Sequence, residues 1–104
     1  MSFEFSQTGG ARLNNSNATY PFAQIAVTAD AIRLTSLGSE YLFPKSQIQS
    51  LDKYSGLFST GLQIHHCVST APQFVVFWLS PFGGSAAFVD LKARLQALGY
   101  QIGA

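Results

Sequence analysis

The amino-acid sequence predicts a mainly β domain in which a strongly bent antiparallel sheet, or partly open barrel, of about seven strands is capped by one C-terminal helix. Three observations predict this class. Short stretches of alternating apolar and polar residues recur between residues 2 and 79, and such alternation is typical of strands with one buried side. After residue 85 the apolar spacing changes to nearly four, as in an amphipathic helix. With 104 residues, the chain is expected to form a single domain over 1–104.

The first half of the chain is predicted to form strands that pair with their neighbours along the sequence. Gly9-Gly10 predicts a turn or a bulge, and Asp30 lies at the tip of a predicted hairpin. Ile32 and Leu34 share the buried face of one strand. The elements predicted here are strands over 2–7, 11–13, 22–29, 31–37 and 40–43, with a polar loop over 14–19.

The second half is predicted to contain three more strands and the helix. Pro44 ends the preceding strand because proline cannot donate to a ladder, and the offset between Ile48 and Leu51 indicates a bulge. The unbroken apolar run over 74–79 is typical of a central strand covered on both faces. Ser85 can cap the helix, and Gly99 supplies a left-handed stop. The predicted strands cover 48–54, 62–68 and 74–79, and the helix buries Phe88, Leu91, Leu95 and Leu98.

Charge and cysteine content narrow the classes of partner and compartment. Only 11% of the residues are charged, and the net charge is +1. The basic residues are scattered, whereas binders of nucleic acid or anionic membranes concentrate Lys and Arg on one surface, so neither partner is expected. A thinly charged surface favours association with a protein, including a second copy of the chain. Cys67 is the single cysteine, which excludes an intramolecular disulfide, and the absence of a secretion signal predicts a cytoplasmic protein.

The strings over 41–48, 54–66 and 74–78, together with the strand plan, resemble one known family. This family comprises small, stand-alone bacterial domains of pleckstrin-homology-like (PH-like) fold without assigned function. The resemblance implies seven strands in two nearly orthogonal sheets capped by the helix, and binding or oligomerisation rather than catalysis. Phosphoinositide-binding members carry clustered Lys and Arg around the first strand pair. Here the hairpin over 22–37 offers only Arg33, so phosphoinositide binding is not expected.

His65-His66-Cys67 is the cluster richest in metal-type ligands. Adjacent strand residues point to opposite faces, so the two imidazoles are not expected to share a metal. His66 is expected to lie inward, buried and hydrogen-bonded, with His65 and Cys67 outward. A metal held between subunits by His65 or Cys67 stays open. The acidic residues are spread along the chain, and no oxyanion site accompanies Cys67, so no catalytic, cofactor-binding or metal-ligating residue and no cofactor are predicted.

The loop over 55–61 is the candidate contact surface, because Leu57 and Phe58 stand at its centre where polar residues are usual. Two interpretations compete. Phe58 covers the open end of the barrel as a lid, or Leu57 and Phe58 insert into a partner or a second copy. His65, expected on an outward or edge position, is the third candidate contact residue.

The sequence therefore favours a non-catalytic interaction module whose partner is an unidentified protein or a second copy of the chain. The alternative is a binder of small apolar ligands that uses a pocket between the sheet and the helix. An enzyme is the least favoured class.

Overall fold

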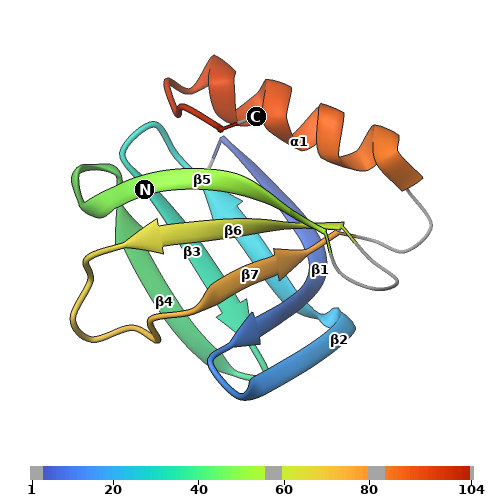
Figure 1. Cartoon of the computed structure of the whole chain (residues 1–104), viewed down its shortest axis with the longest axis vertical. Coiled ribbons are helices and arrows are strands. Elements are labelled where there is room, and N and C mark those ends of the chain that lie inside the picture. Colours follow the sequence, from blue (N-terminus) through green and yellow to red (C-terminus); the bar gives the residue numbers. More distant parts are fainter. Residues whose placement is uncertain (1–3, 56–59, 80–83, 104) are drawn as a thin grey trace.

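The computed structural model describes residues 4–55, 60–79 and 84–103, which form one curled antiparallel sheet with a helix across one end (Figure 1). The strands lie in the order β4-β3-β2-β1-β7-β6-β5. The elements are β1 (Phe5–Leu13), β2 (Ser16–Val27), β3 (Ala31–Ser36), β4 (Ser39–Pro44), the 3-10 turn η1 (Lys45–Gln47), β5 (Ile48–Ser55), β6 (Thr60–His66), β7 (Val75–Trp78) and α1 (Gly84–Ala97). The predicted fold class is confirmed.

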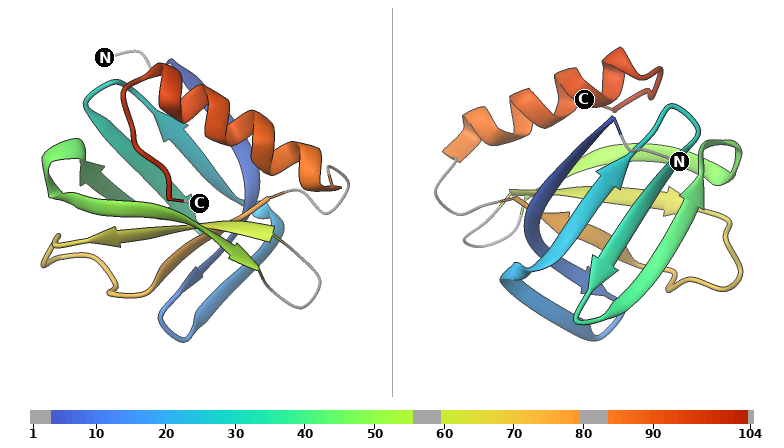
Figure 2. Two further views of the ribbon diagram at one scale, coloured as in Figure 1. Left: turned by 45° about the horizontal axis from the view of Figure 1, so that its top comes forward. Right: turned by 180° about the vertical axis from the view of Figure 1, so that it is seen from behind.

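Strand β1 joins the two halves of the sheet, because it pairs with β2 on one side and with β7 on the other. In the left view of Figure 2 the half that contains β2, β3 and β4 lies behind the half that contains β5, β6 and β7, and in the right view it lies in front. The register of β1 with β2 shifts between Gly9 and Ala11, which confirms a bulge at the predicted position. A Cβ atom at Gly9 would collide with the carbonyl oxygen of Trp78 and the ring of Phe77, so the close approach of the strands requires glycine.

The predicted loop over 14–19 is wrong in extent. Only Asn14 and Asn15 form the turn, and β2 begins at Ser16. Asn14 takes a φ of 56°, a left-handed conformation that asparagine tolerates well. Pairing with β1 gives the following polar residues backbone partners, and this tertiary pairing overrides their local preference for loops.

Other predicted features of the strands are confirmed. Asp30 lies in the bend between β2 and β3, and the register of β5 shifts between Ile48 and Ser50. Strand β7 lies between β1 and β6. Val76 and Phe77 are both fully buried although they point to opposite faces, as expected for a central strand covered on both sides.

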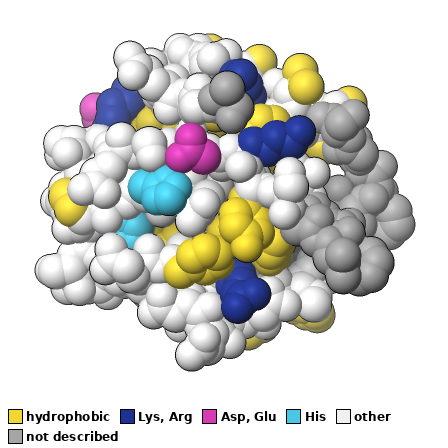
Figure 3. All heavy atoms as spheres, in the orientation of Figure 1, with side chains coloured by type: hydrophobic (Ala, Val, Ile, Leu, Met, Phe, Trp, Pro, Cys, Tyr) yellow, Lys and Arg dark blue, Asp and Glu magenta, His cyan; other side chains and the backbone are white. Residues whose placement is uncertain are grey.

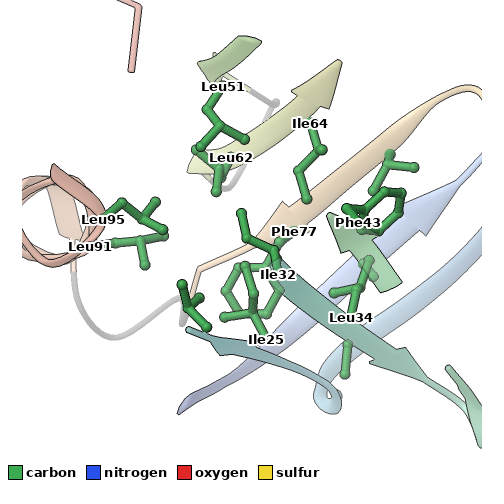
Figure 4. Packing of buried hydrophobic residues seen from close by; sticks show 14 of the residues in the cluster. Ile25, Ile32, Leu34, Phe43, Leu51, Leu62, Ile64, Phe77, Leu91 and Leu95 are labelled. Atoms are coloured by element: carbon green, nitrogen blue, oxygen red, sulfur yellow. The ribbon is translucent and has the colours of Figure 1, made fainter. Parts of the chain in front are cut away.

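The hydrophobic core fills the concave side of the sheet and the space beneath the helix. Figure 4 shows Leu91 and Leu95 pointing from α1 toward side chains from both halves of the sheet. The predicted helix stripe is confirmed, since Phe88, Leu91 and Leu95 are buried and Leu98 packs against the core. The fully buried residues with the largest side chains are Phe43, Phe77, Ile25, Ile32, Leu34, Leu51, Leu62, Ile64, Leu91, Leu95, Val27 and Val75.

Helix α1 begins one residue before the predicted start and ends where glycine allows a left-handed turn. Gly99 has a φ of 88°, its N–H bonds the carbonyl of Gln96 at 3.0 Å, and the N–H of Tyr100 bonds the carbonyl of Leu95 at 3.0 Å. This pair of bonds is the Schellman motif. The capping side chain predicted at Ser85 lies outside the part that the structure describes.

The segment after the helix fastens the helix to both halves of the sheet, a connection that the sequence did not predict. The Tyr100 hydroxyl donates to the Thr28 carbonyl at 2.8 Å. Burial, with a smaller contribution from the charge of Asp30, raises the pKa of Tyr100 to about 12. The N–H of Gly103 donates to the carbonyl of Leu51 on β5 at 2.8 Å. Within the described residues, no helix is long and apolar enough to cross a membrane.

Candidate functional site

The convex side of β1, β7, β6 and β5 carries a cluster of aromatic side chains. Because Phe77 points into the core, its strand neighbour Trp78 points outward. Tyr54 on β5 pairs with Gly61 on β6, and Gly61 pairs with Trp78 on β7, so the three residues lie in one row across the strands. Phe74 directly precedes β7. We call Tyr54, Phe74 and Trp78, with the adjoining Arg12, the aromatic face.

The Tyr54 ring contacts each of the other two rings edge to face. The ring centroid of Tyr54 lies 5.7 Å from that of Phe74 at an interplanar angle of 80° and 5.5 Å from that of Trp78 at 70°. Each ring is half-buried. Aromatic pairs prefer this geometry and gain energy from it beyond the area that they bury. The cluster is therefore a fixed surface, with part of each ring open to solvent.

Polar groups fix the orientation of the outer rings. The indole Nε1 of Trp78 donates to Oδ1 of Asn17 at 3.3 Å. The guanidinium carbon of Arg12 lies 5.7 Å from the centroid of the Phe74 ring, within the range of a cation–π contact. Asn14 accepts a hydrogen bond from the Phe74 N–H at its Oδ1, at 3.0 Å, and donates its own N–H to the Phe74 carbonyl at 2.9 Å.

Glycine makes room for the rings. A Cβ atom at Gly61 would lie 2.6 Å from Cγ1 of Val76 and 3.0 Å from Cε3 of Trp78, so a larger residue would push the indole aside. Gly10 pairs with Trp78 on its other side. Figure 3 shows the result, a group of hydrophobic side chains over β6 and β7 beside a basic side chain.

His65 lies on the same convex side, as predicted, and borders the aromatic face. Its Nε2 lies 3.2 Å from Oδ2 of Asp52, and the two side chains are 43% and 38% exposed. Ser50 donates its hydroxyl to the same carboxylate oxygen at 3.1 Å. The pairing with Asp52 was not predicted, because register across β5 and β6 brings the two residues together. This exposed polar group places the carboxylate of Asp52 at the edge of the aromatic face.

His66 points inward and has a structural role. It is 3% exposed, and its Nδ1 accepts the N–H of Val68 at 2.9 Å. Its Nε2 therefore carries the proton and donates to the carbonyl of Pro72 at 2.7 Å. The prediction of a buried, hydrogen-bonded His66 is confirmed. These bonds hold the connection between β6 and β7 against the sheet, and that connection ends at Phe74.

Cys67 directly follows β6. Cys67 is exposed, and its Sγ lies 3.5 Å from the carbonyl oxygen of Gln47. Among the described residues, no group of three or more His, Cys, Asp or Glu side chains lies close enough to hold a metal ion. The possibility of a metal shared between subunits stays a prediction.

A second apolar surface lies on the convex side of the other half of the sheet. Phe22 and Leu37 are 61% and 62% exposed, and the Leu37 N–H donates to the Phe22 carbonyl at 3.2 Å. Both line a shallow cavity of about 350 Å³. We call this surface the hairpin patch, and its lining residues are Thr8, Pro21, Phe22, Ala23, Gln24, Thr35, Leu37 and Gly38.

A cavity also lies between the sheet and the end of the helix, where the alternative ligand-binding function would place a pocket. It has a volume of about 180 Å³ and is lined by Ile48, Leu51 and Tyr100, with the polar Lys45, Gln49, Ser50 and Gln101 and with Gly99. Ligand pockets usually measure about 300–1,000 Å³ and are mostly apolar, so this cavity gives a small apolar ligand little room.

Of the three predicted contact residues, the structure describes only His65. Leu57 and Phe58 lie outside the described residues, so the choice between lid and contact surface stays a prediction. Sequence reasoning missed the aromatic face, although a signal was present. In the apolar run over 74–79, alternation requires that some of its large side chains point outward, and Trp78 is one of them.

No protein-family model, no curated protein and no solved structure matches this chain. The function of this chain is therefore inferred from the surfaces described above.

Proposed function

We propose that this chain is a non-catalytic interaction module of PH-like fold that binds a protein partner through the aromatic face. The observation that carries the proposal is the cluster of Tyr54, Phe74 and Trp78, three half-buried rings in contact on the convex side of the sheet. Aromatic residues and arginine are the types that dominate the binding energy of protein interfaces. The cytoplasm remains the compartment that we propose.

The cluster supports this function because its geometry is already fixed in the free protein. The contact between Tyr54 and its two neighbours, together with the Asn17 bond to Trp78, restricts the motion of the rings. A surface that is ordered before binding loses less conformational entropy on association. The partly exposed rings offer apolar area, and the guanidinium of Arg12 adds a positively charged hydrogen-bond donor.

The chemistry of this face also indicates what the partner offers. An apolar or planar side chain can pack between rings that stand nearly perpendicular to one another. Arg12 can donate to a carbonyl or carboxylate of the partner while it remains near the Phe74 ring. The six basic residues are scattered along the sequence, whereas a binder of nucleic acid concentrates Lys and Arg on one surface. A polypeptide segment is the partner class that we propose.

Trp78 gives a direct test, because it is the single tryptophan of the chain and its fluorescence therefore reports on the aromatic face alone. A random peptide library displayed on phage is selected against the protein, and selected peptides are titrated while the Trp78 emission is recorded. We expect a saturable spectral shift. Tyr54→Ala and Arg12→Ala should each weaken binding by at least about tenfold, which corresponds to about 1.4 kcal/mol.

Leu42→Ser is the matched control, because Leu42 is an exposed apolar residue on β4, in the other half of the sheet. It should leave the affinity unchanged, and circular dichroism should show that all variants fold. If selected peptides bind the Tyr54→Ala and Arg12→Ala variants as tightly as the parent protein, the aromatic face is not the binding surface.

A further inference from the structure

The hairpin patch combines exposure with an unfavourable backbone conformation. Leu37 and Gly38 form the two-residue turn between β3 and β4, with φ values of 49° and 87°. Positive φ at both central positions defines a type I′ turn, for which Asn-Gly is the preferred sequence. Leucine is disfavoured there because its Cβ crowds the backbone. The turn geometry therefore does not explain why leucine occupies this position.

The two large apolar side chains of the hairpin patch are turned to solvent. Phe22 and Leu37 are each more than 60% exposed, and a Cβ atom built on Gly38 would meet no atom within 4 Å. A large apolar side chain in such a position gains little burial energy from the fold. A contact with another molecule would bury these side chains and supply that energy.

The chemistry of the hairpin patch suits a copy of itself. None of the eight lining residues carries a charge. In a symmetric dimer the same patch occurs on both sides, so groups near the two-fold axis meet their own copies. Apolar groups tolerate this, and so do Thr8, Gln24 and Thr35, because hydroxyl and amide groups both donate and accept hydrogen bonds. Identical charges would repel one another.

The hairpin patch combines two exposed apolar side chains with a shallow cavity. Two projecting side chains, Phe22 and Leu37, stand beside a shallow cavity that they help to line. If a two-fold axis passes between these side chains and the cavity, Phe22 and Leu37 of each copy lie over the cavity of the other copy. The aromatic face differs, because it includes the charged Arg12, and two like charges repel each other near a two-fold axis.

We propose that the hairpin patch joins two copies of this chain into a symmetric dimer, with Phe22 and Leu37 of each copy packed into the shallow cavity of the other. This dimer rests on the proposed function, an interaction module, and makes a second copy of the chain one of its partners. The surface used is the hairpin patch and not the aromatic face. A heterologous protein on the same patch is the alternative outcome.

Sedimentation equilibrium tests the proposal, since the chain has a mass of 11.2 kDa and a dimer has twice that mass. We expect the parent protein to approach the dimer mass as its concentration rises. Leu37→Asp is tolerated by the left-handed backbone and places like charges near the axis, so it should weaken dimerisation by at least about tenfold. Phe22→Asp provides a second variant at a position with an ordinary strand backbone.

Two further arms make the result specific to this patch. Mixing Leu37→Asp with Leu37→Lys should restore a dimer that contains one copy of each, because the charges then attract. Val89→Asp introduces the same charge at an apolar helix position that is 67% exposed and should leave dimerisation unchanged.

A parent protein that stays monomeric at its solubility limit overturns the proposal, as does a dimer that tolerates both Leu37→Asp and Phe22→Asp. Equal loss of the dimer in Val89→Asp also overturns it. None of these results affects the peptide titration, because that experiment monitors Trp78 on the aromatic face. A heterologous partner that requires Phe22 and Leu37 while the protein remains monomeric would replace the second copy as the occupant.

Discussion

The aromatic face and the hairpin patch both expose apolar side chains on the convex side of one sheet, but they are built differently. The rings of the aromatic face contact one another, and Trp78 also bonds Asn17. In the hairpin patch, Phe22 and Leu37 are more than 60% exposed, and Leu37 takes a left-handed conformation that leucine disfavours.

The two surfaces differ in whether their side chains already pack within the folded chain before a partner binds. The aromatic face contributes to folding and is then ready to bind, so substitutions there change stability and binding together. The hairpin patch contributes little to the fold of one chain and gains its energy only on contact. Substitutions there should therefore change association without destabilising the chain.

The largest expected effect is the loss of stability when the indole of the aromatic face is removed. Trp78→Ala should lower the free energy of unfolding by about 2–3 kcal/mol, somewhat less than for a fully buried aromatic residue, because the ring is half-exposed. The reason is the loss of its contacts with Tyr54, Gly61 and Asn17. Chemical denaturation followed by circular dichroism measures the change.

Phe22→Ala is the corresponding substitution in the hairpin patch, and its free energy of unfolding is compared with that of Trp78→Ala. It should change the stability of the isolated chain by less than about 0.5 kcal/mol, as is usual for exposed positions. If Trp78→Ala also costs less than that, the aromatic face is not part of the folded framework and the contrast between the two surfaces disappears.

Most of the framework could be predicted from the sequence because it follows from periodicity. The stripe of Phe88, Leu91 and Leu95 and the alternation of Ile32 and Leu34 each report directly on burial. Gly99 predicts the end of the helix because few other residues take its conformation easily. In such cases the signal lies within a short segment.

Neither surface could be predicted in the same way, because each depends on residues far apart in the chain. Trp78 meets Tyr54 only through the pairing of β5, β6 and β7. Asn14 lies in a turn, as its composition indicates, but its hydrogen bond with Phe74, sixty positions away, could not be predicted from the turn. The contact residues proposed from composition, Leu57 and Phe58, lie outside the described residues, and of the three only His65 is placed beside the aromatic face.

A smaller expected effect is the coupling between two rings of the aromatic face, which tests whether they stabilise the fold as one unit. In a double-mutant cycle with Tyr54→Ala and Trp78→Ala, we expect a coupling free energy of about 0.5–1.5 kcal/mol, the range for edge-to-face aromatic pairs. Denaturation of the four proteins gives this value. A matched cycle with Val89→Ala and Trp78→Ala should give none, because Val89 lies on the helix. Additive losses in the first cycle would mean that the rings do not support one another.

The smallest expected effect concerns Leu37 and has the opposite sign. Leu37→Asn would give the type I′ turn its preferred residue at this position and should stabilise the isolated chain by about 0.5 kcal/mol, since asparagine tolerates the φ of 49°.

This gain should be visible only where the protein is monomeric. Dimerisation stabilises the native state by mass action, so the parent protein should gain stability as its concentration rises and the Leu37→Asn variant should not. Thermal unfolding across a concentration series should therefore show the variant as the more stable protein at low concentration and the parent as the more stable one at high concentration. Parallel curves without a crossing would mean that Leu37 is retained for a reason other than self-association. A variant less stable at every concentration would mean that its side chain contributes to the fold of the single chain after all, so that the hairpin patch resembles the aromatic face in this respect.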